Sequence, residues 1–474
     1  MIIGRKEELA TLESLKQSTE PAFVAVYGRR RVGKTYLIRE YFNDTFTFKL
    51  TGIANVELLQ QLGNFHSSLI RHFPEFEDKP VAKDWFQAFQ QLISSLEADD
   101  SPRKIIFLDE LPWLDNTKSY FIAALEHFWN SWASARKDIL LIVCGSSASW
   151  MINNLINNKG GLHNRVTHRL ILDPFTLAEC EEFFKNKSAT YTRYQIVQLY
   201  MALGGIPFYL NAVDIGKSAV QNINDFCFTP KGFLRKEFNN LYASLFKKAD
   251  KYINVIEALA QKMQGLEREE LLKLANLPNN GNTTKILTEL EESNFITKYN
   301  AFGKNTRHPI YQLIDFYSLF YLRFIKNSNS KDKNFWINSL DSPEVRAWSG
   351  YAFEQICFSH LDEIKKALGI TGVQTNSSAW IGNNGTNKVQ IDLVIDRRDQ
   401  VINLCEAKFS INRFTIDKKY ADELRTKIGV FKDVTQSPKA IFLTLITTFG
   451  LTSNDYAQSL VQNSLTMDAL FESK

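Results

Sequence analysis

The chain has 474 residues, which is too long for a single hydrophobic core, so we expect two to four domains. Its composition of 44% hydrophobic and 23% charged residues is that of an ordinary globular protein and argues against long disorder, while a net charge of +4 favours a polyanionic partner only weakly. Because no apolar run is long enough for a bilayer and the amino terminus turns polar too early for a signal peptide, we expect a cytoplasmic protein without a membrane partner.

The cysteines indicate the redox state of the interior. They are odd in number, scattered and mostly embedded in apolar runs, at Cys144, Cys180, Cys227, Cys357 and Cys405. This pattern predicts reduced core thiols instead of disulfides or a zinc site.

The first element with a chemical signature is the stretch at residues 22–35. Residues 22–27, AFVAVY, form a continuous apolar run that predicts a buried parallel strand, and a helix is expected to begin near Lys34. The loop after the strand meets every fixed position of the pattern G-x-x-x-x-G-K-S/T with Gly28, Arg29, Arg30, Arg31, Val32, Gly33, Lys34 and Thr35. Its glycines let main-chain amides surround phosphate groups, Lys34 would reach the β and γ phosphates, and Thr35 would bind magnesium. We therefore predict a site for ATP and Mg²⁺; an ordinary glycine turn would leave the flanking strand and helix unexplained.

A second predicted strand, residues 104–108, ends in two acids. Asp109 and Glu110 follow its apolar residues directly, an arrangement in which the first carboxylate holds Mg²⁺ and the second orients or deprotonates water. A third predicted strand, within DILLIVCGSS at residues 138–147, ends in Ser146 and Ser147, either of which could contact the γ-phosphate or the attacking water. A serine-capped turn explains either serine equally well.

The order of several motifs resembles that of the archaeal-type ATPases of the AAA+/STAND group. These motifs are IIGRKEELATLESL at residues 2–15, the glycine loop, FLDELPWLD at 107–115, CGSSASWM at 144–151, NRVTHRLILDPFTLAE at 164–179 and LGGIPFYL at 203–210. The resemblance implies that Gly4 and Arg5 lie against the nucleotide base, and that Arg165, or Arg169 in its place, senses the γ-phosphate. It also implies that LGGIPFYL belongs to a helical lid near the nucleotide. Surface arginines and a simple helix stop remain the alternatives.

Residues 249–314 read as three helices followed by two strands around Gly303, which predicts a winged-helix domain. The presumed recognition helix carries Glu289, Glu291 and Glu292 against Lys285. Helices that read DNA grooves are normally basic. We therefore prefer a packing or regulatory role for this domain over base recognition.

The carboxy-terminal part has a polar cluster on apolar strands. Residues 389–396, VQIDLVID, and 401–410, VINLCEAKFS, predict a hairpin in which Glu406 and Lys408 share one face. Asp392 and Glu406 could bind a divalent ion, and Lys408 could position water or stabilise the pentavalent phosphate. An ion-paired strand without a ligand is the alternative.

These residues resemble the core of the PD-(D/E)XK nucleases, in which Glu354, on the predicted helix WSGYAFEQICFSHL at residues 348–361, would be the acid that some such enzymes add. The chain departs from the family pattern at Ile391, where a proline is usual before the first acid. The segment HPIYQLIDFYSLFYLRFI at residues 308–325 resembles the segment that joins this nuclease-like domain to archaeal-type ATPases.

We predict an α/β protein of five segments: a P-loop, AAA+-like ATPase core at 1–175, a helical lid at 176–248, a winged-helix domain at 249–314, a helical linker at 315–345 and a restriction-endonuclease-like domain at 346–474. The expected function is ATP hydrolysis whose nucleotide state controls DNA binding or Mg²⁺-dependent cleavage. A STAND-type switch that binds nucleic acid or a protein partner without cutting is the alternative. DNA is favoured over RNA as a partner, and a homo-oligomer is possible.

Overall fold

The computed structural model describes residues 1–116, 118–157, 160–162, 164–246, 248–300, 302–303, 309–328 and 332–472. The chain divides into two compact units. Met1–Pro174 with Thr288–Asn294 forms the first, and Phe175–Leu287 with Phe295–Lys474 forms the second. Within the described ranges, no helix combines the length and the apolar character needed to cross a membrane.

The first unit is built on a five-stranded parallel sheet with the order β2-β3-β4-β1-β5. Its strands are β1 (Ala22–Gly28), β2 (Phe48–Thr51), β3 (Lys104–Asp109), β4 (Ile139–Gly145) and β5 (His168–Leu172). All residues of β1 and β4 are buried, because helices cover both faces of a parallel sheet. This burial explains why these strands read as continuous apolar runs. The parallel order brings the carboxyl ends of β1, β3 and β4 to one edge.

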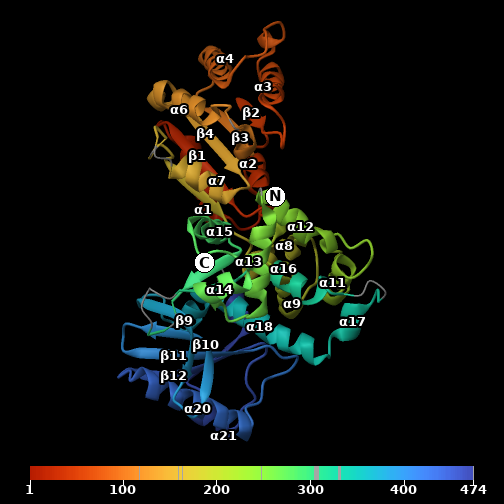
Figure 1. Ribbon diagram of the computed structural model, residues 1–474, viewed down its shortest axis with the longest axis vertical. Helices are drawn as coiled ribbons and strands as arrows, with labels where there is room; N and C mark the ends of the chain where they lie inside the picture. The colour runs from red at the N-terminus through yellow and green to blue at the C-terminus, as the bar shows by residue number, and fades with distance from the viewer. Residues whose placement is uncertain are drawn as a thin grey trace. The chain divides into compact units, whose positions relative to one another are not determined.

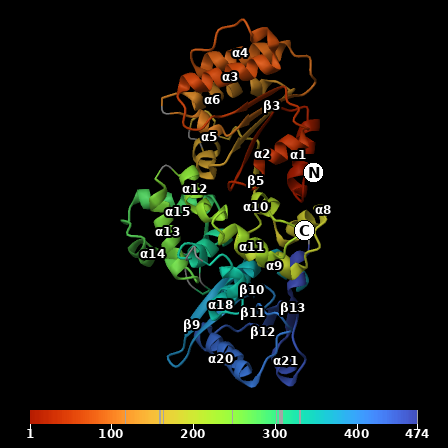
Figure 2. The ribbon, with the colours of Figure 1, turned by 90° about the vertical axis from the view of Figure 1, so that its right-hand side faces the viewer.

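Seven helices accompany this sheet: α1 (Lys6–Gln17), α2 (Lys34–Tyr41), α3 (Leu58–His72), α4 (Trp85–Ala98), α5 (Leu111–Leu114), α6 (Phe121–Ser131) and α7 (Ala148–Trp150). Helices α3, α4 and α6 lie together in Figure 2 and share one aromatic core with the sheet. In that core, the rings of Phe65 and Phe121 both meet Trp85 edge-on. Helix α2 begins at Lys34, as the sequence predicts.

The second unit opens with α8 (Leu177–Asn186), α9 (Arg193–Leu203), α10 (Pro207–Asn211), α11 (Ala219–Cys227) and α12 (Leu234–Leu245). Helices α8, α9 and α11 start at capping boxes, in which Thr176, Thr192 and Ser218 each cap the helix. The glycine pair after α9 has a steric reason, because a Cβ on Gly205 would lie 1.8 Å from the main-chain oxygen of Phe175.

A small three-stranded antiparallel sheet follows, with the order β6-β8-β7. Its elements are α13 (Ala249–Gln261), β6 (Leu266–Glu267), α14 (Arg268–Leu274), α15 (Gly281–Glu292), β7 (Ile296–Tyr299) and β8 (Ile310–Leu313). The three helices and two strands predicted for this region are confirmed. Strand β6 is an addition, since two residues are too short to give a pattern. Part of the predicted turn, residues 301 and 304–308, lies outside the described residues.

The rest of the second unit carries a mixed sheet with the order β13-β12-β11-β10-β9 (Figure 1). Strands β9 to β11 pair antiparallel, and β11 to β13 pair parallel. The elements are α16 (Phe316–Phe320), α17 (Phe335–Ser339), α18 (Pro343–Ser359), α19 (Leu361–Ala367), β9 (Thr375–Asn383), β10 (Lys388–Arg397), β11 (Val401–Lys408), α20 (Lys418–Thr435), β12 (Ala440–Thr447), α21 (Asp455–Leu460) and β13 (Asn463–Thr466). The predicted hairpin is β10–β11, and α18 is the predicted helix that carries Glu354.

Helices α18 and α20 both pack against β10, so the sheet brings side chains of two distant helices to the same pair of strands. Trp380 and Phe431 meet edge-on in the core between β9 and α20. All five cysteines of the chain are buried with free thiols.

Candidate functional sites

The phosphate loop leaves the buried end of β1 and enters α2 without a break. Gly28 has a φ of +140°, and a Cβ there would lie 2.2 Å from the main-chain oxygen of Leu172, so this position requires glycine. Arg31 and Gly33 also have positive φ angles, of 72° and 91°. In loops of this kind such turns let successive main-chain amides converge on a phosphate, and the N-terminal dipole of the following helix adds positive potential.

Lys34 lies inside this loop. Its Nζ donates hydrogen bonds to the main-chain oxygens of Gly28 at 3.0 Å and Arg29 at 2.7 Å, and the residue is 6% exposed. Burial lowers the pKa of Lys34. Loop carbonyls therefore bind the ammonium group of Lys34. A bound phosphate could replace them as its hydrogen-bond partner.

Thr35 and Asp109 meet at the edge of the sheet. The Thr35 hydroxyl donates to the two Asp109 carboxylate oxygens at 3.1 and 3.0 Å. Burial, with a further contribution from Glu110, raises the pKa of Asp109, and the thiol of Cys144 also donates to this carboxylate. A hydroxyl beside a carboxylate is a donor set that fits Mg²⁺. The contact of Cys144 was not foreseen, although the pairing of Leu108 with Val143 places it beside Asp109.

Glu110 lies next to Ser146, as two adjacent strand ends suggest. A carboxylate oxygen of Glu110 accepts a hydrogen bond from the Ser146 hydroxyl at 2.8 Å, and the Ser146 amide lies 3.4 Å from the same oxygen. Glu110 has a φ of +49°, a strained value for a residue with a side chain. Ser147, the alternative to Ser146, is the N-cap residue of α7.

The residues that the ATPase resemblance adds differ in burial and in contacts. Gly4 and Arg5 both have positive φ angles, and the Arg5 guanidinium donates to the main-chain oxygens of Asp173 at 2.6 Å and Val32 at 3.5 Å. Arg5 thus joins the amino-terminal segment to the phosphate loop. Arg165 is exposed, and so is Arg169, which lies on β5 opposite Ala25.

The carboxy-terminal cluster starts from the β10–β11 hairpin. Leu393 pairs with Cys405, which brings Asp392 beside Glu406, and a carboxylate oxygen of Asp392 accepts a hydrogen bond from the main-chain amide of Ala407 at 3.1 Å. Glu406 is 1% exposed, whereas Asp392 is only half-buried. The hairpin therefore brings two carboxylates close together, and one of them is more exposed to solvent than the other.

Helix α20 supplies two partners for Glu406 that the sequence did not reveal. Lys427 donates to both carboxylate oxygens at 2.7 Å, and the Tyr420 hydroxyl lies 3.4 Å from one of them. Lys408 is farther, at 3.8 Å. Burial lowers the pKa of Lys427, but Glu406 and Asp392 outweigh it, so its net pKa is raised. Of these two lysines, Lys427 is therefore the one that lies closer to Glu406.

Glu354 of α18 completes this cluster electrostatically. Burial and repulsion from Asp392 raise the pKa of Glu354 to about 8. The same two causes raise the pKa of Glu406 to about 7, even though Lys427 and Lys408 lower it. Three carboxyl groups face two lysines in a poorly solvated place, so the two glutamates hold their protons to a higher pH than exposed glutamates do.

Carboxylate oxygens suit a hard divalent cation in kind. In number they fall short, because among the described residues no group of three His, Cys, Asp or Glu side chains is assembled to hold a metal ion. An ion at Asp392 and Glu406 would need further oxygens from water, main chain or substrate.

Residues 2–213 match a protein family described as an ATPase domain predominantly from Archaea. This range contains the phosphate loop, Asp109, Glu110 and Ser146, whose contacts are given above. The amino-terminal part of the chain is therefore an ATPase domain of this archaeal type.

Known proteins are similar over longer stretches. The chain is 25% identical over 384 residues to the uncharacterized protein MJECL04 of Methanocaldococcus jannaschii, covering 77% of this chain and 78% of that protein. Among solved structures, the Walker-type ATPase PABY2304 of Pyrococcus abyssi is 17% identical with a TM-score of 0.49, covering 68% of this chain and 96% of that one. The ORC2 protein of Aeropyrum pernix is 13% identical with a TM-score of 0.39, covering 67% and 92%.

Proposed function

We propose that the ATPase domain controls a carboxy-terminal domain that binds nucleic acid, DNA in preference to RNA, and cleaves it with the help of a divalent cation. In this proposal residues 1–175 are the ATPase core and 176–248 its helical lid. Residues 249–314 form a winged-helix domain, 315–345 a linker and 346–474 a nuclease-like domain. The order of helices and strands in each segment supports this division.

In the ATPase half, the loop amides and Lys34 bind the phosphates of ATP. Thr35 and Asp109 would hold Mg²⁺, which when bound neutralises phosphate charge. Glu110 accepts the proton of the attacking water, and Ser146 keeps its carboxylate in place. Gly4 and Arg5 border the nucleotide, and Arg165 or Arg169 senses the γ-phosphate.

The observation that carries the cleavage half is the electrostatic cluster around the β10–β11 hairpin. Burial, reinforced by repulsion from Asp392, raises the pKa values of Glu354 and Glu406. Burying carboxylates is costly, and a cationic ligand would lower the part of this cost that Lys427 and Lys408 leave. Asp392 and Glu406 would hold this divalent ion, and Lys408 would face the phosphate that is cleaved.

One observation favours binding without cleavage. Both oxygens of Glu406 are already engaged by Lys427 at 2.7 Å, so the carboxylate has a cation without a metal. In this second candidate function, the carboxy-terminal domain recognises nucleic acid or a protein partner and the ATPase domain acts as a switch.

The small sheet region is assigned a packing role in both functions. Glu289 on α15 is 9% exposed, and burial, together with Glu289 and Glu291, raises the pKa of Glu292 to about 6. A helix with this charge is poorly suited to lie in a DNA groove.

Cleavage is tested with single-stranded, duplex and branched DNA and with RNA, each with Mg²⁺ or Mn²⁺ and with or without ATP. We expect metal-dependent products from the parent protein and none from Asp392→Ala, whose ATPase rate should equal that of the parent. Absence of products from the parent on every substrate would eliminate cleavage and leave the switch.

A further inference from the structure

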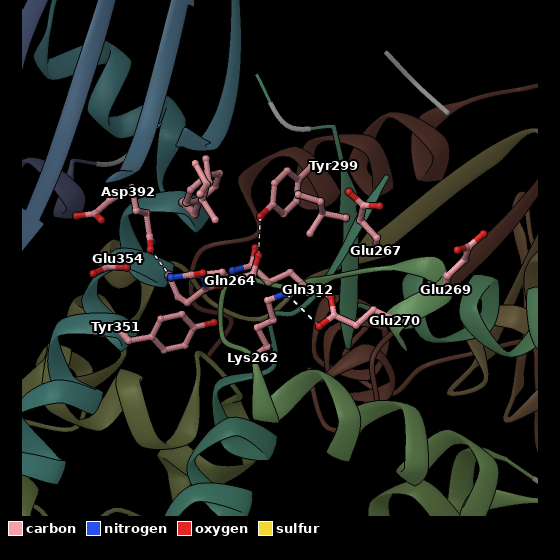
Figure 3. Close-up of a pocket in the computed structure, with 17 residues that line it drawn as sticks. Lys262, Gln264, Glu267, Glu269, Glu270, Tyr299, Gln312, Tyr351, Glu354 and Asp392 are labelled. Atoms are coloured by element: carbon pink, nitrogen blue, oxygen red, sulfur yellow. Dashed lines mark hydrogen bonds and ion pairs between the residues drawn. The ribbon is translucent and has the colours of Figure 1, made fainter. Parts of the chain in front are cut away.

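The second unit contains a cavity of about 440 Å³ that opens onto Glu354 and Asp392. Its walls come from the chain around β6, from β7 and β8, from α18, and from β9 and β10 (Figure 3). The volume lies in the lower part of the range of small-ligand sites, about 300–1,000 Å³. The other members of the carboxylate cluster, Glu406, Lys408 and Lys427, are not among the described residues that line it. The cavity is therefore a separate chamber on one side of the carboxylate cluster.

Carboxamide groups form one part of the polar lining of this cavity, beside the carboxylates of Glu267, Glu269, Glu270, Glu354 and Asp392. Four glutamines contribute: Gln264, Gln312, Gln355 and Gln390. Gln312 and Gln355 are buried in the wall, and the side-chain amide of Gln264 donates to that of Gln390. Figure 3 shows Gln264 between the carboxylates of Glu354 and Asp392 and the ring of Tyr299. A carboxamide presents a donor beside an acceptor, as the edges of nucleobases do.

Three aromatic rings complete the lining: Tyr299, Tyr351 and Phe358. The Tyr299 hydroxyl donates to the main-chain oxygen of Gln264 at 3.0 Å, and the Tyr351 hydroxyl donates to that of Met263 at 2.7 Å. Both hydroxyl donors are thereby used within the chain. Tyr351 is buried in the wall, whereas Tyr299 is half-buried with its ring 6.4 Å from that of Phe358, so Tyr299 is the tyrosine whose ring a ligand could contact. Planar surfaces with amide edges suit a planar heteroaromatic group.

The charge at the rim restricts what can enter. Glu267, Glu269 and Glu270 are exposed there, and Lys262 is the one basic residue among the described lining residues. Lys262 pairs with Glu270 at 2.9 Å, which leaves the rim acidic. Duplex DNA carries a negative charge about every 1.7 Å along its axis. An acidic rim therefore opposes the close approach of a duplex more than that of a single unpaired nucleotide.

We propose that this cavity binds one unpaired nucleobase of a nucleic-acid strand. The base replaces the amide pairing between Gln264 and Gln390, and its ring lies against Tyr299. This inference rests on the proposed function in one respect, the nucleic-acid partner, and does not require cleavage. It assigns the substrate class as single strands, overhangs or strands with a flipped nucleotide.

Binding is measured by fluorescence anisotropy with the full-length protein, in Ca²⁺ so that cleavage is not needed for the readout. The probes are one labelled oligonucleotide as a single strand, as a blunt duplex, and as a single strand in which successive nucleotides are replaced by abasic sites. We expect the single strand to bind at least about tenfold tighter than the blunt duplex, and one abasic position to weaken binding by about tenfold.

Two variants locate the effect. Tyr299→Ala, which removes the ring, should weaken single-strand binding by about tenfold, whereas Tyr299→Phe, which keeps it, should stay within about threefold of the parent. Tyr120→Ala, which removes an exposed tyrosine outside the cavity, is the control for loss of a tyrosine and should bind like the parent.

Equal affinity for single strand and blunt duplex, no effect of any abasic site, or an unchanged Tyr299→Ala variant would each overturn the inference. Cleavage in Mg²⁺ is scored separately on the same strands. Base-dependent binding without products would retain the cavity and remove the nuclease, whereas cleavage of blunt duplex as fast as single strand would do the reverse.

Discussion

The ATPase site and the carboxy-terminal site are assembled in different ways. The first consists of eight consecutive loop residues and the ends of two neighbouring strands, which parallel topology brings to one edge. The second draws side chains from α18, β10, β11 and α20, which span more than seventy positions from Glu354 to Lys427. The eight consecutive residues of the phosphate loop make the first site recognisable in the sequence, although Asp109, Glu110 and Ser146 join it only through the fold. The second site contains no such contiguous motif.

The charge balance separates the two sites as well. At the ATPase site, Asp109 already shares its oxygens with the Thr35 hydroxyl, and Lys34 rests on loop carbonyls. At the carboxy-terminal site, Glu354 and Glu406 have pKa values of about 8 and about 7 because burial and mutual repulsion oppose their charges. The first site thus surrounds its lysine and its aspartate with neutral polar groups, whereas the second holds carboxyl groups whose ionisation is opposed by burial.

The largest effect is expected from Lys34→Ala. This change removes the cation that would neutralise the β and γ phosphates, so affinity for ATP should fall by about a hundredfold or more. Titration calorimetry with Mg²⁺ and ATP measures it. Circular dichroism should show a folded protein, since the loop carbonyls released from Lys34 can be hydrated.

The control for this variant is Lys137→Ala, which removes an exposed lysine of the same unit and should leave ATP binding unchanged. If Lys34→Ala bound ATP as the parent does, the phosphate loop would have no part in the mechanism, and the contrast between the two sites would disappear.

Glu110→Gln tests the chemistry at the same site without removing the ligand. The amide oxygen can still accept from Ser146, but the group no longer takes a proton from water, so turnover should fall by about 10²-fold while ATP affinity is kept. Steady-state phosphate release gives the rate, and Glu75→Gln, an exposed acid of the same unit, is the matched control. Turnover within a few-fold of the parent would reduce Glu110 to a strand-end acid.

The two sites also show what a sequence can and cannot predict. The strand, loop and helix around Lys34 follow from local patterns, because each feature depends on neighbours in the chain. The β10–β11 hairpin follows likewise from alternation. Lys427 could not be predicted, since α20 carries lysines at 418, 419, 427 and 432 and only packing selects the one that reaches Glu406.

The sequence also could not predict which parts of the molecule surround Asp392 and Glu406. Alternation places Glu406 and Lys408 on one face, but it does not say which face meets a helix and which meets a cavity. The structure gives Asp392 to the cavity and Glu406 to α20. The contacts of Arg5 with Asp173 join residues far apart in the chain and were unpredictable for the same reason.

Lys427→Met sharpens the comparison at the second site. Without Lys427, the Tyr420 hydroxyl and the more distant Lys408 are the partners of Glu406 that remain among the described residues. The pKa of this glutamate should therefore rise above its value of about 7. Cleavage that needs ionised Glu406 should then shift to higher pH and fall by about tenfold at pH 7.

The pH profile distinguishes this tuning from a structural role. Lys427→Arg keeps the charge and should restore the parent profile, and carboxylate NMR of Glu406 reports its titration even if no cleavage is found. Coincident titration curves for the parent and Lys427→Met would show that Lys427 does not set the charge of this site.

The smallest expected effect is on stability. It follows from the pKa values of Glu354 and Glu406 and is measured with metal ions removed by a chelator. Glu354 and Glu406 bind protons more tightly in the folded chain than at their ordinary pKa of 4.5, so between about pH 4.5 and 8 the folded state holds more protons than the unfolded state. The stability of this region should therefore fall as pH rises through this window. Hydrogen exchange of the amides of β10 and β11 measures it locally, with faster exchange at pH 8 than at pH 5 after correction for the intrinsic rate.

In Glu354→Gln, which cannot ionise at this position, the pH dependence should be weaker because one of the two titrating groups is gone and the repulsion on Glu406 is reduced. Asp362→Asn, an exposed acid on α19, should leave the slope unchanged. If exchange depended on pH equally in Glu354→Gln and in the parent, Glu354 would be solvated like a surface carboxylate. Its ionisation would then not destabilise the fold, and the proposed difference between the two sites would be lost.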